Sequence, residues 1–204
     1  MGSGLYIWKI KNRTLIILLL LLFLGCKEPQ KQESLRAIPN QNKIENGYIV
    51  CRLGNGYFSK HFKKFASQQI IYSNIGRVSK ENNDIYVYHS EASELSGVGH
   101  VKKETISSFL EDIEIYDFFQ LKYPDSTKIK IINKVKTYYS KKTPFDLNFD
   151  SYNDNEVYCT ELIAISINKA LKKEVIKPTL SVYGKKLYAL DDIYLNENIK
   201  KVEL

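Results

Sequence analysis

The sequence predicts an α+β domain in which a small antiparallel sheet packs against one helix. Runs rich in β-branched and aromatic residues alternate with segments of helical period, and short turns join several of them, which favours antiparallel pairing. Towards the end of the chain, the apolar residues after Cys159 fall on one stripe of a buried helix: Leu162, Ile163, Ile167, Ala170 and Leu171.

The first 25 residues indicate an export signal. Basic residues at positions 9, 11 and 13 precede an apolar run of eleven residues, Thr14 to Leu24, and Gly25 and Cys26 follow. Such a run is too short to cross a bilayer, which needs roughly 20 residues. Its end resembles the lipobox of bacterial lipoproteins, which implies cleavage and lipid modification of Cys26. We therefore expect a protein of the bacterial cell envelope, anchored to a membrane through several acyl chains.

Residues 26–43 comprise Cys26, the predicted site of lipidation, and a predicted flexible tether. The tether is predicted because these residues are mostly polar and have no apolar period. Fully extended, the tether reaches on the order of 50 Å. Residues 44–204 have the length of one domain. Without the three basic residues of the signal, the net charge falls from +7 to +4, and the lysines are scattered among acidic residues. That pattern predicts a solvated surface and no nucleic-acid partner.

The first half of the domain shows three strand-like runs. Gly47 to Leu53 is predicted to be a strand, and a short helix follows from Tyr57 to about Gln68. Gln69 to Val78 and Asp84 to Glu91 are two further strands, and the turn-forming residues 80–83 between them favour a hairpin.

The second half alternates in the same way. Lys103 to Leu110 is a predicted short helix, and Ile113 to Lys122 is a predicted third strand of the meander. Asp125 and Ser126 are predicted to cap a longer helix that runs to about Ser140. A loop rich in turn formers then leads to Cys159, and Ser181 to Leu204 is predicted to form short strands or an extended edge.

Cys159 is the first candidate for chemistry, because it stands where the last long helix begins. Unpaired N–H groups and the positive end of the helix dipole favour a thiolate there and could bind an oxyanion. A lone cysteine followed by apolar residues is also typical of a small buried hydrophobe. The sequence alone leaves both interpretations open.

Two further candidates lie on the predicted hairpin. His89 shares a strand face with Ile85 and Val87, which is also typical of a structural histidine, and Glu91 on that face could orient a histidine. Asn74 is unusual in a strand and predicts a specific hydrogen bond. No spacing indicates a zinc site, a P-loop or a dinucleotide site, so we expect no metal and no cofactor.

The order of several motifs resembles that of the YiiX/YebB-like cysteine hydrolases. The resemblance covers residues 45 to 175 and includes these segments: Gly47-x-Ile49-Val50-x-Arg52-x-Gly54-x-Gly56, Ser73-Asn74-Ile75-Gly76, His89, Phe145-Asp146, and Tyr158-Cys159-Thr160-Glu161-Leu162. It implies a circularly permuted papain-like fold of the NlpC type. It also implies a cysteine amidase or peptidase, which transfers acyl groups from cell-wall peptides or from lipid amides and esters.

In this resemblance, Cys159 takes the position of the nucleophile. The family has Ser-His-(Val/Ile)-Gly where this chain has Ser73-Asn74-Ile75-Gly76, so Asn74 occupies the position of the base. His89 takes the position of the polar residue that orients the base. Tyr48 and Arg77 also depart from the family pattern, in which an Asp and an aliphatic residue are expected.

Three alternatives follow. In the first, His89 is the base and Asn74 orients it, as in other Cys-His-Asn sets, and the protein is an active hydrolase. In the second, the protein is a catalytically degenerate module that binds a peptide or lipid in the cleft that corresponds to the active site of the family. In the third, Cys51 and Cys159 form a disulfide and the domain is structural.

Overall fold

The computed structural model describes residues 39–204, apart from 65, 94, 150 and 152. The predicted signal peptide, Cys26 and most of the predicted tether lie outside the described residues. In the described part of the chain, no helix combines the length and the apolar character that a membrane span requires.

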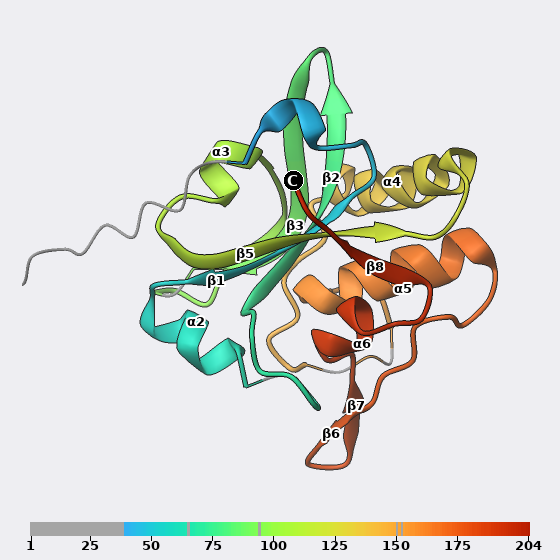
Figure 1. The fold of residues 1–204 in the computed structure, drawn as a ribbon. Coiled ribbons are helices and arrows are strands. Elements are labelled where there is room, and N and C mark those ends of the chain that lie inside the picture. The colour runs from blue at the N-terminus through green and yellow to red at the C-terminus, as the bar shows by residue number, and fades with distance from the viewer. Residues whose placement is uncertain (1–38, 65, 94, 150, 152) are drawn as a thin grey trace, which may run out of the picture. The chain divides into compact units, whose positions relative to one another are not determined.

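Six antiparallel strands form one sheet in the order β4-β3-β2-β1-β5-β8 (Figure 1). The strands are β1 (Ile49–Gly54), β2 (Asn74–Glu81), β3 (Asp84–Ala92), β4 (Gly99–Thr105), β5 (Ile113–Leu121) and β8 (Ile199–Val202). A separate hairpin consists of β6 (Leu180–Val182) and β7 (Lys185–Leu187). The mixed α+β class with an antiparallel sheet, predicted from the sequence, is confirmed.

Two long helices, α4 (Asp125–Ser140) and α5 (Cys159–Leu171), pack against each other and against β2 and β3. The remaining helices are short: η1 (Gln41–Lys43), a 3₁₀ turn, α2 (Tyr57–Phe62), α3 (Ile106–Phe109) and α6 (Asp191–Tyr194). The chain therefore has helices on both faces of the sheet (Figure 1).

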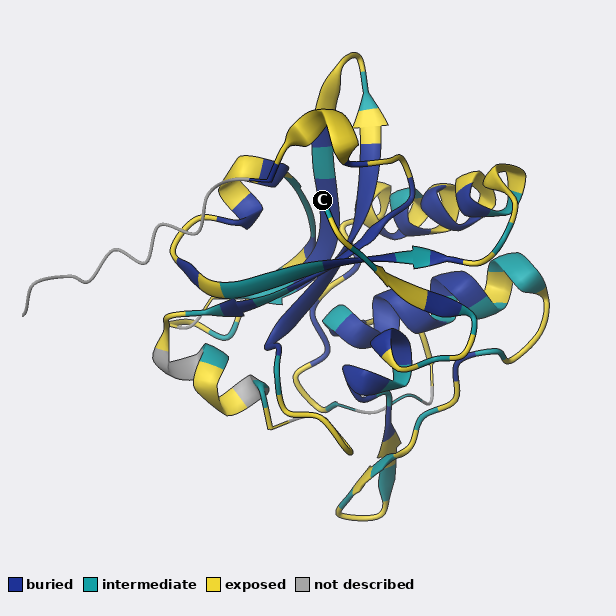
Figure 2. Cartoon of the chain, viewed as in Figure 1, coloured by how far each residue is buried: buried dark blue, intermediate teal, exposed yellow. Residues whose placement is uncertain are grey.

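The sheet is buried on both faces at its centre (Figure 2). On the α5 face, Ile163 and Ile167 pack against Ile75 and other apolar side chains of β1 and β5. On the opposite face, Val78 and Val87 pack against residues of α3, Phe109 among them. Burial of one such side chain contributes about 1.5–3 kcal/mol, so these contacts hold the start of α5 against the sheet.

The β2–β3 hairpin fixes a register that matters for the site. Its two-residue turn has positive φ at Asn82 (50°) and Asn83 (73°), the geometry of a type I′ turn that matches the twist of the strands. The register pairs Arg77 with Tyr88. Continued along the hairpin, the same register brings Gly76 opposite His89 and Asn74 opposite Glu91.

The sequence prediction was wrong for residues 103–110. Gly99–Thr105 is strand β4, which pairs with β3 at the edge of the sheet, and only Ile106–Phe109 is helical. Thr105 caps that short helix by accepting the N–H of Ser108 at 3.2 Å. Cross-strand ion pairs of lysines on β4, such as Lys103 with Glu81 at 2.7 Å, stabilise the strand and outweigh the weak helical pattern.

Other boundaries also differ from the prediction. Helix α2 ends at Phe62, and β2 begins only at Asn74. Strand β5 pairs with β1 and not with the hairpin, so the three predicted strands are not a meander. Pro124, not Asp125, is the N-cap of α4. The final segment contains the predicted short strands and, between them, the helix α6.

We expect Gly76→Ala to lower the free energy of unfolding by about 1–3 kcal/mol, the usual cost of overpacking a core. A Cβ at this position would lie 2.3 Å from Cγ1 of Val87 and 3.3 Å from Cβ of His89. Urea denaturation measures the change. Lys80→Ala, at an exposed position of the same strand, is the matched control and should cost much less. Equal stability of Gly76→Ala and wild type would contradict the packing described for the hairpin.

Candidate functional site

Cys159 is the first residue of α5, and the residues around it explain why the helix begins there. The carboxylate of Glu161, almost fully buried, accepts the backbone N–H of Tyr158 at 3.4 Å. This contact is one half of a capping box, which satisfies a donor that a helix start otherwise leaves unpaired. The Cys-Thr-Glu sequence thus holds the thiol at a fixed helix end.

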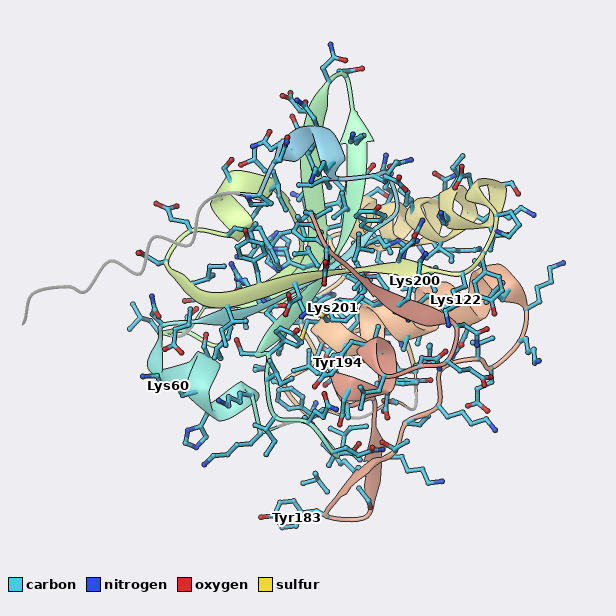
Figure 3. All side chains as sticks on the ribbon, viewed as in Figure 1. Lys60, Lys122, Tyr183, Tyr194, Lys200 and Lys201 are labelled. Atoms are coloured by element: carbon cyan, nitrogen blue, oxygen red, sulfur yellow. The ribbon has the colours of Figure 1, made fainter. Side chains whose placement is uncertain are left out.

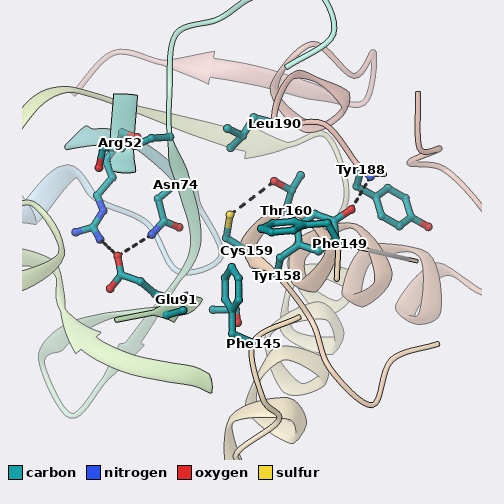
Figure 4. Close-up of a pocket in the computed structure, with 14 residues that line it drawn as sticks. Arg52, Asn74, Glu91, Phe145, Phe149, Tyr158, Cys159, Thr160, Tyr188 and Leu190 are labelled. Carbon is teal, nitrogen blue, oxygen red and sulfur yellow. Dashed lines mark hydrogen bonds and ion pairs between the residues drawn. The ribbon is translucent and has the colours of Figure 1, made fainter. Parts of the chain in front are cut away.

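A pocket opens beside the thiol of Cys159 (Figure 4). Its cavity volume of about 90 Å³ is several times what one water molecule needs. One wall is polar, with Arg52, Ser73, Asn74, Ser90 and Glu91. The other wall is largely apolar and aromatic, with Ala92, Phe145, Phe149, Tyr158, Tyr188 and Leu190.

Asn74 lies at the start of β2 beside the thiol, and its amide orientation is fixed by two contacts. Its Nδ2 donates to Oε1 of Glu91 at 3.1 Å, and its Oδ1 accepts the N–H of Ile75 at 2.7 Å. In Figure 4 the amide lies between the carboxylate and the sulfur of Cys159. The specific hydrogen bond expected for a strand asparagine is therefore present.

Glu91 is the orienting partner of Asn74, a position that the resemblance assigned to His89. Besides Asn74, the carboxylate contacts Nη2 of Arg52 at 2.6 Å and Nζ of Lys102 at 2.8 Å. Burial acts to raise the pKa of Glu91, but its interactions with His89, Arg52 and Lys102 outweigh burial and lower the pKa. The carboxylate is therefore ionised and held from three sides.

His89 is not among the residues that line the pocket. The side chain is fully buried, its ring packs edge-on against Phe109 with 4.9 Å between centroids, and Nε2 lies 3.2 Å from Oε2 of Glu104. Burial lowers its pKa, which favours the neutral ring. The physical reason for this position is the hairpin register, which brings His89 opposite Gly76 instead of Asn74. A base role for His89 stays a prediction that none of these contacts supports.

The Cys159 thiol is less acidic than its helix position suggested. Burial raises its pKa, although hydrogen bonds from Thr160 and from the backbone of Ile75 act in the opposite direction. The hydroxyl of Thr160 lies 3.8 Å from the sulfur. At neutral pH the sulfur therefore carries its proton, with N–H donors directed at it.

Cys51 does not form the disulfide considered from the sequence, because both Cys51 and Cys159 are free thiols in the structure. Cys51 is fully buried on β1 in the core beneath α5, and burial raises its pKa well above the usual value. It is a core residue of the sheet.

Two pocket residues had no signal in the sequence. Tyr188 and Leu190 come from the C-terminal segment that was predicted as an extended edge. They reach the pocket because the N–H of Tyr188 donates to the hydroxyl of Tyr158 at 2.7 Å, which ties this segment to the start of α5. Only the fold brings residues so distant in sequence to one wall.

The structure is similar to a solved structure described as metalloprotein yiiX from Escherichia coli O157:H7. The TM-score is 0.63, and the match covers 78% of this chain and 96% of that chain at 17% sequence identity. The chain thus has a YiiX-like fold, in agreement with the resemblance found in the sequence. The sequence itself matches no protein-family model and no curated protein.

We expect alkylation of Cys159 by iodoacetamide to be slow at neutral pH and to accelerate only above roughly pH 8.5, the usual pKa of a free thiol. The physical reason is the burial that raises its pKa. Peptide mass spectrometry resolves Cys159 from the other cysteines. His89→Gln should leave the rate within about twofold of wild type after correction for any unfolded fraction. A thiol that reacts fast at pH 7, and slows when His89 is changed, would contradict this geometry.

Proposed function

We propose that this protein is a catalytically degenerate relative of the papain-like cysteine hydrolases, which binds an acyl-containing ligand in the old cleft. One observation carries the proposal: the residue between the Cys159 thiol and the Glu91 carboxylate is Asn74, whose amide cannot take up a proton. The Cys159 thiol would correspond to the nucleophile of a triad, and the Glu91 carboxylate to its orienting residue. An amide occupies the position between them, where a triad has its base.

The missing base removes the step on which hydrolysis depends. A positioned general base typically contributes 10²–10⁴-fold to the rate. Cys159 needs such a base because burial raises its pKa, and the Glu91 carboxylate is already engaged by Arg52, Asn74 and Lys102. Cys159 is therefore proposed as a contact residue of the ligand site instead of a nucleophile that turns over.

The YiiX-like fold of the chain supports this relation. The YiiX-like fold, a cysteine at the N-terminus of a helix and a polar strand residue beside it are the arrangement that the resemblance implies. The motif order in the sequence points the same way. We therefore infer descent from the cysteine amidases and peptidases, with loss of turnover.

The walls of the pocket favour an uncharged, largely apolar ligand. Five of its side chains are large and apolar or aromatic: Phe145, Phe149, Tyr158, Tyr188 and Leu190. The charge of Glu91 is balanced by its two cationic partners. The N–H groups directed at Cys159 could donate to a ligand carbonyl. Of the two substrates considered, a lipid acyl group fits this apolar wall better than a cell-wall peptide does.

The cellular setting follows from the N-terminal prediction. A lipid on Cys26 would anchor the protein to a membrane of the bacterial cell envelope, and residues 27–43 would act as its tether. An acyl ligand would then be available from the same membrane. The lipid on Cys26 can be tested by mass spectrometry of the protein purified from membranes.

The binding proposal is tested by titrating the purified full-length protein with a fluorescent dodecanoyl amide. Binding should survive Cys159→Ser, because the thiol is a contact and does not react. Leu190→Arg should weaken binding at least about tenfold, the effect of about 1.4 kcal/mol, by placing a charge in the apolar wall. Leu195→Arg, at a surface position close by in sequence, is the matched control. Binding that is absent, or equal in all four proteins, would reject the site.

Degeneracy itself is tested by restoring the base with Asn74→His. The imidazole would stand between Glu91 and Cys159, so we expect alkylation of Cys159 at pH 7 to accelerate at least about tenfold, since an adjacent histidine lowers a thiol pKa. Slow hydrolysis of an acyl thioester should appear with it. Asn74→Ala is the control and should gain neither. A wild-type protein that hydrolyses the thioester as fast as Asn74→His would overturn the proposal.

A further inference from the structure

Three side chains, the pocket residue Glu91 among them, converge in an arrangement that the proposed function does not use as a group. His89 and Glu91 alternate on β3, and Glu104 comes from the neighbouring strand β4. One ligand atom of each, a ring nitrogen or a carboxylate oxygen, lies within 4.8 Å of the others. We propose that His89, Glu91 and Glu104 form a binding site for a divalent transition metal of the Zn²⁺ class, and that the ammonium of Lys102 competes with the metal for it.

The imidazole of His89 points to a ligand because it is buried without a hydrogen bond. The side chain is 0% exposed, and neither ring nitrogen has a hydrogen-bond partner. Nε2 nevertheless lies 3.2 Å from Oε2 of Glu104. The carboxylate is thus close enough for a hydrogen bond but lies off the direction that a ring N–H would take. Buried polar atoms rarely lack a hydrogen-bond partner unless a ligand or a water molecule supplies one.

The separation of the His89 and Glu104 ligand atoms suits a tetrahedral metal, and Glu91 lies within 4.8 Å of both. Ligands that bind zinc at 2.0–2.2 Å with tetrahedral angles are separated by about 3.3–3.6 Å. The 3.2 Å between His89 and Glu104 is close to that separation. A metal on the axis of the ring nitrogen also explains why the carboxylate lies beside that axis. One imidazole and two carboxylates are ligands that Zn²⁺ accepts, with the fourth position left to water.

Lys102 occupies the place of the cation in the described state. Its Nζ lies 2.8 Å from Oε2 of Glu91 and 3.5 Å from Oε1 of Glu104, between the same two carboxylates. The lysine side chain is 33% exposed on the edge strand, so its ammonium can leave for solvent while its stem stays packed. Arg52 holds the other oxygen of Glu91, Oε1, which keeps that carboxylate in position when Lys102 leaves.

Replacement of the Lys102 ammonium by a metal ion would affect the pocket, because Glu91 belongs to both sites. The carboxylate contacts Asn74 through Oε1 and Lys102 through Oε2, so one residue joins both sites. The local sequence His89-x-Glu91 carries no specific zinc signal, and Glu104 joins it only through the pairing of β3 with β4. This explains why sequence spacing alone predicted no metal.

The test titrates the purified full-length protein with Zn²⁺ by calorimetry and with Co²⁺ by absorption spectroscopy, in a Cys159→Ser background. The parent Cys159→Ser protein should bind one ion with a cobalt spectrum that lacks thiolate bands. Glu104→Gln should weaken binding by more than the roughly 10- to 100-fold that loss of even an outer-shell partner costs. His89→Gln should do the same.

Substitution of Lys102 gives the more specific test, because removal of its charge should increase the affinity for the metal. Lys102→Met is expected to tighten Zn²⁺ binding at least about tenfold by removing the competing charge. Lys103→Met is the matched control, because Lys103 lies next to Lys102 on β4 but pairs with Glu81 of β2, and it should leave the affinity unchanged. The proposal fails if Lys102→Met does not tighten binding, if Glu104→Gln leaves it intact, or if no ion binds.

Discussion

The carboxylate of Glu91 is the contact on which the candidate site depends. It is held by Arg52 from β1, by Asn74 from β2 and by Lys102 from β4, so one side chain of β3 joins four strands of the sheet. Charge-assisted hydrogen bonds of this kind are short and directional, and they fix the Asn74 amide as firmly as a histidine would be fixed in a triad. A carboxylate held by two cations thus orients the amide that lies beside the Cys159 thiol.

The pocket beside Cys159 combines a fixed helix start with a largely apolar lining. The helix start at Cys159, the capping carboxylate of Glu161 and the N–H donors near the sulfur are present. Among the described residues that line the pocket, none is a histidine, the side chain that ordinarily titrates near neutral pH. Burial then keeps the thiol protonated, and the aromatic wall makes the same cavity suitable for holding an acyl group.

Much of the fold could be predicted from local signals. The turn at Asn82 and Asn83 and the apolar stripe of α5 identified the β2–β3 hairpin and the buried helix, because backbone geometry and period are local properties. Residues 103–110 were mispredicted because β4 is stabilised by ion pairs across strands, which no local pattern reveals. The candidate site was found in part: Cys159 and Asn74 lie together, whereas His89 is displaced by the register of the hairpin. A shift of that register by two residues decides whether His89 or Glu91 stands beside Asn74, and sequence alone does not fix it.

The central claim concerns which side chain stands beside the thiol, and a crystal structure with a dodecanoyl amide bound would test it most directly. The decisive distances run from the sulfur of Cys159 to the Asn74 amide and to the ring nitrogens of His89. Our account predicts the Asn74 amide beside the sulfur, hydrogen-bonded to Glu91, with His89 buried next to Glu104 and away from the sulfur. An imidazole nitrogen of His89 within roughly 3.2 Å of the sulfur, the reach of a general base, would contradict it.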